Sequence, residues 1–488
     1  MQKVDLLLVN PGNRMEQFAN LNELATVAQP LGLAMIAAFV REHGFSVAII
    51  DAEAHFWTTE RTVDEIEKYD PMLIGLSAFT TKMTAAGKIL RLIKKRMPDV
   101  KTVIGGHHPS ALLEQTLNEE IVDWVVKGEG YYPIIQLLGG IKDAKDRIVP
   151  NRSQSFFSSG EFRFFDDSEG SSVKSLDDLP CAAWDLLPMD KYRAHHWQTW
   201  DYNLEQSGFA LIYTSLGCPF NCQYCSVNVV YGSHKVRYRN PKSVAIEIAL
   251  LVEYCNVKHI EIIDDTFTLN PKRVEAICDE IIALGLGDKV NMWCFARVDR
   301  VSPKLMEKMK KAGINWVFMG FESGDDMVLQ GVNKRQTVRQ IREAVKVVHD
   351  AGIHIGGNYV FGMPNDTQET MRETLDLAKE LNTEYANFFV LMAYPGTELY
   401  NIAKEKGYPL PEKWGQYGFF APDAVPMRNE NLTAEDILTF RDNAFIEYFT
   451  NSRYQSMIKD KFGQNIVDFI NNKVLSKKLV RHGILREP

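Results

Sequence analysis

Long hydrophobic runs are missing from this sequence of 488 residues. Its most apolar stretch, residues 31–39, is too short to cross a membrane, so we expect no transmembrane segment. Basic residues are outnumbered, with 55 Lys and Arg against 63 Asp and Glu and a formal net charge of −8. Nucleic-acid-binding proteins carry a basic surface, so we expect no nucleic-acid partner. The first residues lead into a strand-like segment without the pattern of a signal peptide, which predicts a cytoplasmic protein.

Cysteine is also scarce, and this scarcity narrows the roles of the seven that are present. Four are isolated along the chain, where a lone cysteine usually behaves as a small buried side chain: Cys181, Cys255, Cys278 and Cys294. Disulfides are rare in a reducing cytoplasm, so we expect none here. The other three, Cys218, Cys222 and Cys225, form a close Cys-x3-Cys-x2-Cys run that is typical of metal binding.

A fourth cysteine is missing near this run, and its absence bears on the kind of metal group. Iron–sulfur clusters usually take four thiolates, and a structural zinc ion takes four ligands. Three thiolates on one loop therefore predict a [4Fe–4S] cluster whose fourth iron stays open for another ligand. His234, which follows the run at short spacing, leaves zinc as an alternative.

The run resembles the signature of the radical SAM enzymes, because an aromatic residue, Tyr224, precedes the third cysteine. The resemblance implies that the open iron binds the amino and carboxylate groups of S-adenosylmethionine (SAM). It also implies that one electron from the cluster cleaves SAM to a 5′-deoxyadenosyl radical, which abstracts hydrogen from an unactivated position. In such enzymes the cofactors supply the chemistry, and the protein positions the reactants.

The length of the chain predicts two or three domains. Strand-like and helix-like segments alternate in the first third, which predicts an α/β, doubly wound, Rossmann-like sheet. We expect its strands at residues 4–9, 46–51, 72–77, 100–104 and 123–127, with helices at 30–43 and 82–96. The expected domains are a Rossmann-like domain at 1–140, a polar connector at 141–204, a barrel at 205–400 and a helical domain at 401–488.

Glycine-rich and polar turns follow these strands, at the edge of the sheet where ligands bind in such folds. Glycines allow a ligand to approach backbone amides closely. The set resembles the cobalamin-binding domain that precedes the radical SAM core in one large subclass of these enzymes. The resemblance implies cobalamin contacts from Asn10, Ser77, Thr80, Gly105, Gly106, His107, His108, Gly128, Glu129 and Gly130.

The first strand is not followed by the Asp-x-His-x-x-Gly motif that supplies an axial histidine in many cobalamin proteins. The resemblance then implies a base-off cobalamin with no protein histidine on cobalt. His107 and His108 are adjacent, so we expect at most one to face the ligand, and a structural role is the alternative for each. A domain that has kept this fold without the cofactor is the alternative for the whole segment.

Six further strand-like segments alternate with helix-like ones in the middle of the chain, which predicts an incomplete, TIM-like (β/α)6 barrel. We expect its strands at residues 210–214, 259–263, 291–296, 316–320, 354–360 and 386–391. Function in such barrels lies at the carboxyl ends of the strands. The resemblance implies SAM contacts from Tyr224, Asp264, Asp265, Arg297, Glu322, Ser323 and Gly357. The structural alternatives are a helix cap for one aspartate, and a surface ion pair of Arg297 with Asp299 or Glu322.

The C-terminal helices are expected to close over the barrel mouth, because a radical must be kept from solvent.

The resemblance as a whole implies a cobalamin-dependent enzyme that methylates an unactivated carbon, or phosphorus, of a small-molecule or lipid-like substrate. A reductant such as flavodoxin or ferredoxin would supply the electron. Radical cyclisation, ring contraction or rearrangement without methyl transfer is the first alternative. A non-catalytic iron–sulfur electron-transfer protein is the second.

Overall fold

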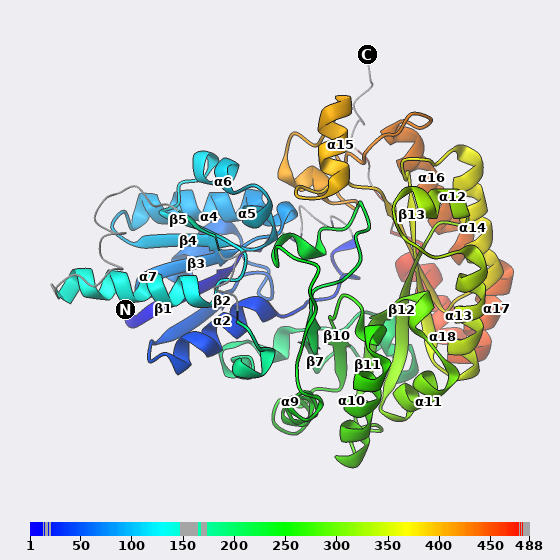
Figure 1. Ribbon diagram of the computed structural model, residues 1–488, viewed down its shortest axis with the longest axis horizontal. Coiled ribbons are helices and arrows are strands. Elements are labelled where there is room, and N and C mark those ends of the chain that lie inside the picture. The colour runs from blue at the N-terminus through cyan, green and yellow to red at the C-terminus, as the bar shows by residue number, and fades with distance from the viewer. Residues whose placement is uncertain are drawn as a thin grey trace.

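The computed structural model describes residues 1–12, 14, 18, 21–146, 164–166, 173–477, 479 and 481. Two parallel sheets of six strands each form its framework, and helices cover both (Figure 1). The α/β fold class is confirmed, with a Rossmann-like N-terminal sheet, a partial barrel and a helical C-terminus. None of the described helices is long and apolar enough to span a membrane.

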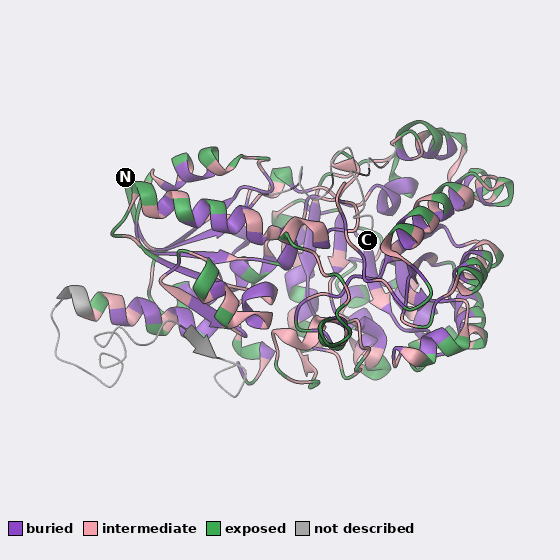
Figure 2. Cartoon of the chain, turned by 90° about the horizontal axis from the view of Figure 1, so that it is seen from above, coloured by how far each residue is buried: buried purple, intermediate pink, exposed green. Residues whose placement is uncertain are grey.

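The N-terminal sheet has the strand order β2-β1-β3-β4-β5-β6, and every neighbouring pair is parallel. Its strands are β1 Gln2–Asn10, β2 Val47–Asp51, β3 Tyr69–Ser77, β4 Lys101–Gly105, β5 Trp124–Lys127 and β6 Phe164–Asp166. Its helices are α2 Leu31–Glu42, α3 Thr59–Ile66, α4 Met83–Arg96, α5 His107–Ala111, α6 Leu113–Glu119 and α7 Tyr131–Asp146. Apolar side chains on the two faces of the sheet form separate core clusters, so its central strands are buried (Figure 2). The five strands expected in this domain are all present.

The sixth strand, β6, is absent from the sequence-based prediction. It pairs parallel with β5 and lies within the segment expected to be a connector. A strand of three residues is too short to display the hydrophobic periodicity on which such a prediction depends. The N-terminal sheet therefore extends beyond residue 140 into the 141–204 segment.

The barrel sheet has the order β14-β13-β12-β11-β10-β7 and is parallel throughout. Its strands are β7 Phe209–Ile212, β10 His259–Ile262, β11 Asn291–Ala296, β12 Ile314–Glu322, β13 His354–Phe361 and β14 Tyr385–Val390. A short antiparallel pair, β8 Ser215–Leu216 and β9 Arg237–Tyr238, follows β7. The helices are α9 Pro241–Tyr254, α10 Pro271–Ala283, α11 Pro303–Lys311, α12 Asp326–Gly331, α13 Val338–Asp350, α14 Gln368–Leu381, α15 Glu398–Lys406, α16 Ala434–Phe449, α17 Ser452–Phe462 and α18 Gln464–Phe469. All six expected barrel strands are present.

The barrel is open, and its β7 edge faces the N-terminal domain (Figure 1). The buried side chain of Gln29 pairs with this edge. Its Nε2 donates to Phe209 O at 2.6 Å, and its Oε1 accepts from Leu211 N at 3.1 Å. Unpaired amide and carbonyl groups of an edge strand cost free energy when they are buried. One glutamine amide thus takes the place of a neighbouring strand at the joint between the domains.

Of the expected C-terminal helical domain, residues 418–420 line the cavity beside the cysteine loop, but α16 and α17 lie elsewhere. α16 packs on the flank of the barrel against α14, β13 and β14. Phe462 of α17 packs on Trp316 and His354, at the amino ends of β12 and β13. A 3₁₀ helix of the connector, Trp197–Tyr202, reaches the same end, and its Trp200 also packs on Trp316. Aromatic packing therefore draws these segments to the end of the barrel opposite its mouth.

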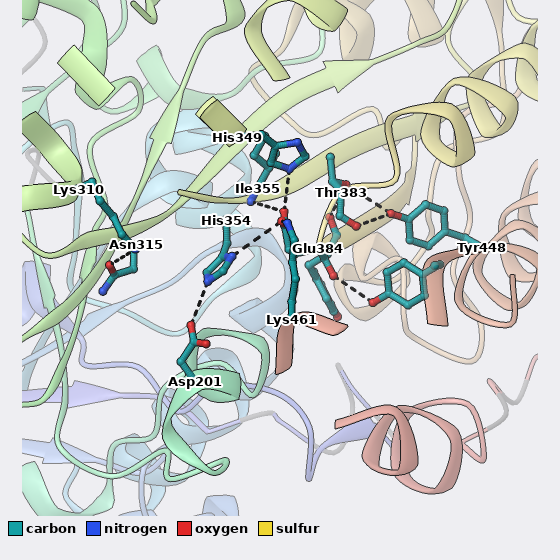
Figure 3. Close-up of polar contacts among 12 residues, drawn as sticks. Asp201, Lys310, Asn315, His349, His354, Ile355, Thr383, Glu384, Tyr448 and Lys461 are labelled. Carbon is teal, nitrogen blue, oxygen red and sulfur yellow. Dashed lines mark hydrogen bonds and ion pairs between the residues drawn. The ribbon is translucent and has the colours of Figure 1, made fainter. Parts of the chain in front are cut away.

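A buried polar network crosses this amino end of the barrel (Figure 3). The fully buried Glu384, just before β14, has a carboxylate oxygen 3.2 Å from His349 Nε2 and forms an ion pair with Lys461 of α17. His354 Nδ1 lies 3.8 Å from the other oxygen of Glu384, while its Nε2 lies 3.0 Å from Asp201 Oδ2. The network therefore joins the connector, the barrel and the C-terminal helices.

This network predicts a pH dependence of stability. Burial lowers the pKa of His354, but hydrogen bonds to Asp201 and Glu384 outweigh burial and raise it above its ordinary value. A histidine whose pKa is raised by folding contributes stability below about pH 6.5, and this contribution is lost as the pH rises through the folded-state pKa. We expect denaturant unfolding between about pH 6 and 9 to show a steeper loss of stability for wild type than for His354→Gln. Parallel profiles of stability against pH for the two proteins would contradict this prediction. The control is His43→Gln, at an exposed histidine, whose profile should follow that of wild type.

Candidate functional site

The three cysteines lie on the loop between β8 and β9, just beyond the carboxyl end of β7. Gly217 opens this loop with a φ of 94°, and a Cβ added there would lie 2.4 Å from Lys235 O. Only glycine fits this close approach. Cys225 N donates to Cys222 O at 3.1 Å, which forms a tight turn within the run. The local sequence thus brings the three thiols onto one short, constrained loop.

The donor set fits an iron–sulfur cluster. Cys218 and Cys222 are partly exposed and Cys225 is exposed, so all three thiols are accessible to a ligand. In the described part of the chain, no three Cys, His, Asp or Glu side chains are already arranged around a single ion. His234, the alternative fourth ligand, has its Nδ1 3.0 Å from Phe220 O. Three soft thiolates along one loop suit a cluster that bridges them.

Tyr224, Glu322 and Lys334 meet beside this loop. Glu322 ends β12 with a φ of 67°, a conformation that is uncommon for a residue other than glycine. Its carboxylate accepts hydrogen bonds from Lys334 Nζ at 2.6 Å and from the Tyr224 hydroxyl at 3.2 Å. Both members of the ion pair are buried. Strained backbone and a buried ion pair beside the cysteines are typical of a functional position.

Lys334 is a site residue that the sequence analysis missed. It lies in the loop after α12, where the preceding residue, Asn333, accepts a long hydrogen bond from Cys222 Sγ at 3.9 Å. The backbone of this loop adopts positive φ at Asn333 and Arg335. A polar Asn-Lys-Arg run shortly after Glu322 was the signal in the sequence, but nothing in that run indicates which side chain turns inward.

Arg297 connects the cysteine loop to the Lys334 loop. Its guanidinium lies 3.8 Å from the centre of the Phe220 ring, and its Nη2 donates to Lys334 O at 3.0 Å. The ion pair with Asp299 also exists, with Nε 3.0 Å from Oδ1. This pair is not a surface feature, because Arg297 is buried. The structure therefore links Arg297, Glu322 and Tyr224, three of the residues predicted to contact SAM, and their role toward SAM stays a prediction.

The two adjacent aspartates differ in their surroundings. Asp264 is fully buried, and its oxygens accept hydrogen bonds from Thr214 N and Oγ1, both at 2.5 Å, and from Ser215 Oγ at 2.6 Å. These contacts tie it to the end of β7. Asp265 is only partly buried, and burial followed by the charge of Asp264 raises its pKa to about 6. Asp265 is therefore the carboxylate of this pair with capacity left for a ligand.

Ser323 and Gly357 have contacts within the barrel wall. Ser323 Oγ lies 3.2 Å from Thr374 Oγ1 of α14. Gly357 lies inside β13, and a Cβ added there would lie 2.9 Å from Phe321 and from Tyr359. In this structure both residues pack around β12 and β13. They are not part of the cluster that Tyr224, Glu322 and Lys334 form beside the cysteines.

We expect Lys334→Met to weaken SAM binding by about tenfold or more, because a hydrogen bond to a charged group contributes about 1.5–3 kcal/mol. Loss of the ammonium leaves the buried Glu322 without the partner that orients it. Equilibrium binding of SAM to the reconstituted protein checks this, with iron content as a control for the cluster. Lys334→Arg should restore part of the affinity, and Lys310→Met, on α11, should match wild type. Unchanged affinity of Lys334→Met for SAM would rule out a role of Lys334 in SAM binding.

Six of the cobalamin candidates gather where β3 and β4 end: Ser77, Thr80, Gly105, Gly106, His107 and His108. Gly106 has a φ of 105°, and a Cβ added there would lie within 2.9 Å of Ala78 N, so glycine is required. His107 stacks on Phe79 with ring centres 5.0 Å apart. Buried His108 packs edge-on against Trp414 at 4.4 Å. Burial lowers the pKa of both histidines to about 4, so both are neutral at pH 7.

Asn10 is already engaged by neighbouring side chains. Its Nδ2 donates to Asp51 Oδ1 at 2.7 Å, and its Oδ1 accepts from Lys82 Nζ at 3.1 Å. Asp51 also accepts a hydrogen bond from the Tyr192 hydroxyl at 2.8 Å. Asn10 therefore belongs to a polar cluster that links the ends of β1 and β2 to the connector.

The loop at residues 128–130 faces the barrel side of the domain. Gly128 N donates to Ser110 Oγ at 3.0 Å. Glu129, a predicted cobalamin contact, forms an ion pair with Arg237 of β9 at 2.6 Å. Gly130 lies under α2, where a Cβ would meet Ile36 Cδ1 at 3.0 Å. In this structure the contacts of this loop are therefore made with the protein itself.

A cavity of about 260 Å³ lies between the two halves of the site. Its lining residues are Phe18, Phe79, Thr80, Thr81, His107, Ser226, Val229, Tyr394, Pro395, Gly418, Phe419 and Phe420. Thr80 and His107 come from the cobalamin candidates, while Ser226 and Val229 directly follow the cysteine run. None of these lining residues is an acid, a lysine or an arginine. The two halves of the predicted site thus face one uncharged space.

Comparison with known proteins agrees with this arrangement. Residues 19–138 match the B12 binding domain family, and residues 212–378 match the radical SAM superfamily. The chain is 31% identical to an uncharacterized methyltransferase, PH0819, of Pyrococcus horikoshii, over 95% of each protein. It is 26% identical to an anaerobic magnesium-protoporphyrin IX monomethyl ester cyclase of Rubrivivax gelatinosus, over 88% of this chain and 77% of that protein.

A solved structure extends the likeness to the whole fold. OxsB, a cobalamin-dependent SAM radical enzyme with aqua-cobalamin and SAM bound, superposes with a TM-score of 0.67. The alignment covers 97% of this chain and 72% of that one, at 15% identity. The two matched families fall on the two sheets that enclose the cavity. Their combination, and the relative that matches 95% of the chain, confirm the family predicted from the cysteine run: this chain is an enzyme that belongs to the cobalamin-binding radical SAM family.

Proposed function

We propose that this protein is a cobalamin-dependent methyltransferase that transfers a methyl group from SAM to an unactivated carbon, or phosphorus, of a small-molecule or lipid-like substrate. The observation that carries the proposal is the shared cavity. Residues that follow the cysteine run and residues at the carboxyl ends of the N-terminal strands line the same space. Two cofactors held on these two sides would both reach one substrate.

When bound, the cluster supplies the electron that cleaves SAM, and cobalamin supplies the methyl group. The chain itself binds and orients. Cys218, Cys222 and Cys225 would hold the cluster, and the Glu322–Lys334 pair and Asp265 would hold SAM beside it. The lining has no acid, lysine or arginine, which would suit a radical that must be kept from solvent. We also propose a cytoplasmic protein that receives its electron from a flavodoxin or ferredoxin.

A second candidate is radical cyclisation or rearrangement within the same architecture. The relative at 26% identity is named a cyclase, and this observation keeps the candidate open. The relative at 31% identity is named a methyltransferase and matches nearly the whole chain, which favours methyl transfer. Neither name identifies the substrate of this protein.

The two reactions differ in what happens to SAM. We would reconstitute the protein without oxygen, add hydroxocobalamin, SAM and a reductant, and count 5′-deoxyadenosine and S-adenosylhomocysteine by mass spectrometry. Methyl transfer yields both products, with corrinoid retained by the protein. 5′-Deoxyadenosine alone would favour cyclisation or rearrangement. Neither product from a protein with a fully loaded cluster would refute the radical reaction and leave an electron-transfer protein.

We propose that cobalamin binds base-off, with no histidine of this chain on cobalt. His108 supports this, because its Nδ1 is 3.3 Å from Thr80 Oγ1 and its ring is buried against Trp414. His107 lines the cavity but stacks on Phe79. We therefore expect His107→Ala to retain hydroxocobalamin with an unchanged visible spectrum. A spectral shift on loss of His107 would contradict the proposal and identify an axial ligand.

A further inference from the structure

One ion pair joins the cobalamin side of the site to the cluster side. Arg237 Nη2 lies 2.6 Å from Glu129 Oε1, and Arg237 Nη1 lies 3.0 Å from Glu129 Oε2, so the pair is bidentate. The side chain of Glu129 is 7% exposed and that of Arg237 is 21% exposed. Bidentate arginine–carboxylate pairs fix orientation as well as distance. This geometry defines the relative position of two loops more tightly than a surface ion pair would.

Glu129 lies in the loop that a ligand at the edge of the N-terminal sheet would meet. This loop connects β5 to α7, and Gly128 enters it with a φ of 89°. Gly128 N donates to Ser110 Oγ of α5, the helix that follows β4 and begins with His107 and His108. A ligand that displaces the ends of β4 or β5 therefore acts directly on Glu129.

Arg237 lies beside the first cysteine. In the β8–β9 pair it stands opposite Leu216, the second residue before Cys218. Gly217, between them, approaches Lys235 O so closely that no side chain fits. A movement of Arg237 is therefore passed to Cys218 through two adjacent backbone contacts, without a flexible link.

Arg237 also contacts two further segments. Its Nη1 donates to Val173 O of the connector at 2.7 Å, and its guanidinium lies 5.9 Å from the centre of the Tyr231 ring. Tyr231 lies in the loop that carries Cys225 and the cavity residue Val229. One side chain thus holds the N-terminal domain, the connector and the cluster loop together.

We propose that Glu129 and Arg237 are positioning residues that couple cobalamin binding to the order of the cluster loop, an inference that rests on the proposed function. Cobalamin at the edge of the N-terminal sheet fixes the 128–130 loop, and the ion pair then fixes the hairpin that carries Cys218. Energetic coupling of this kind requires a contiguous chain of packed contacts, which these residues supply.

Hydrogen exchange of the cluster hairpin, residues 213–239, tests the coupling without turnover. We would measure it in the full-length protein with and without hydroxocobalamin, and follow corrinoid retention by absorbance. In wild type we expect cobalamin to slow exchange of the hairpin by about tenfold, a typical size for coupling between two sites. Arg237→Gln should retain corrinoid but lose this protection, and Glu129→Gln should lose the protection as well. Arg237→Lys keeps the positive charge but lacks the planar guanidinium that makes the bidentate contact, so it should recover part of the protection.

The matched control is Arg41→Gln. Arg41 forms a bidentate pair with Asp185 of the connector, at 2.7 and 2.8 Å, remote from the cysteines. We expect this variant to keep the full effect of cobalamin on the hairpin. Equal protection in wild type and in both Gln variants would overturn the coupling, as would bound corrinoid without any protection in wild type. Failure of wild type to retain corrinoid would instead overturn the cobalamin part of the proposed function, and the coupling with it.

Discussion

We expect Cys222→Ala to abolish the reductive cleavage of SAM. The proposed cluster would rest on three thiolates with no fourth cysteine nearby in the sequence, so loss of one would leave two ligands for four irons. The partly exposed Cys222 lies at the centre of the run, and its Sγ also contacts Asn333 O in the Lys334 loop. Iron content, the charge-transfer absorbance and 5′-deoxyadenosine formation should therefore all fall to background after reconstitution.

The control for this variant is Cys181→Ala, at an exposed cysteine of the connector. This protein should bind iron and form 5′-deoxyadenosine as wild type does. Because hydroxocobalamin is expected to bind the N-terminal domain, Cys222→Ala should still retain corrinoid. If Cys222→Ala kept its cluster absorbance and continued to cleave SAM, the assignment of the cysteine run would be wrong.

Glu384→Ala is expected to destabilise the protein by about 3 kcal/mol, at the lower end of the range for breaking a buried ion pair. Glu384 is completely buried, and its removal leaves His349, Lys461 and Ile355 N without their shared acceptor (Figure 3). Several hydrogen bonds lower the pKa of Glu384 well below its ordinary value despite burial, so the carboxylate is charged at neutral pH. Denaturant unfolding followed by tryptophan fluorescence measures the loss, because Trp316 and Trp200 lie beside α17.

Glu380→Ala provides the comparison. Glu380 pairs with Arg342, and both side chains are about half exposed, so the expected cost is under about 0.5 kcal/mol. A loss of similar size in both variants would show that burial of the network contributes little. SAM and corrinoid binding should survive Glu384→Ala at low temperature, because the network lies at the end of the barrel opposite the cysteines.

Local patterns predicted much of the fold. The hydrophobic runs of the parallel strands, buried on both faces, were long enough to locate five strands of the N-terminal sheet and all six of the barrel. β6 was not predicted, because three residues are too few to display the hydrophobic periodicity of a strand. The positions of α16 and α17 were not predicted, because an amphipathic pattern indicates that a face is buried and does not indicate against which surface. Here the aromatic side chains around Trp316 and Phe462 decide that surface.

The candidate site divides in the same way. Cys218, Cys222 and Cys225 lie within eight residues, so their metal-binding role could be predicted from spacing, while the role of Tyr224 came from the family resemblance. Adjacent Asp264 and Asp265 could not be told apart, because only the packed barrel shows that Thr214 and Ser215 engage the first. Lys334 was missed because its ion pair with Glu322 depends on the backbone conformation of the loop after α12.

The sequence by itself determined the family and the fold class of this protein. Both depend on features that neighbouring residues carry together: thiol spacing, glycine turns and strand-length hydrophobic runs. Only the tertiary structure decided which polar side chains remain available to ligands. It showed that Glu129, a predicted cobalamin contact, pairs with Arg237, which lies far away in the chain. The physical reason is that a buried charge must find a partner, and the partner is chosen by how the domains pack.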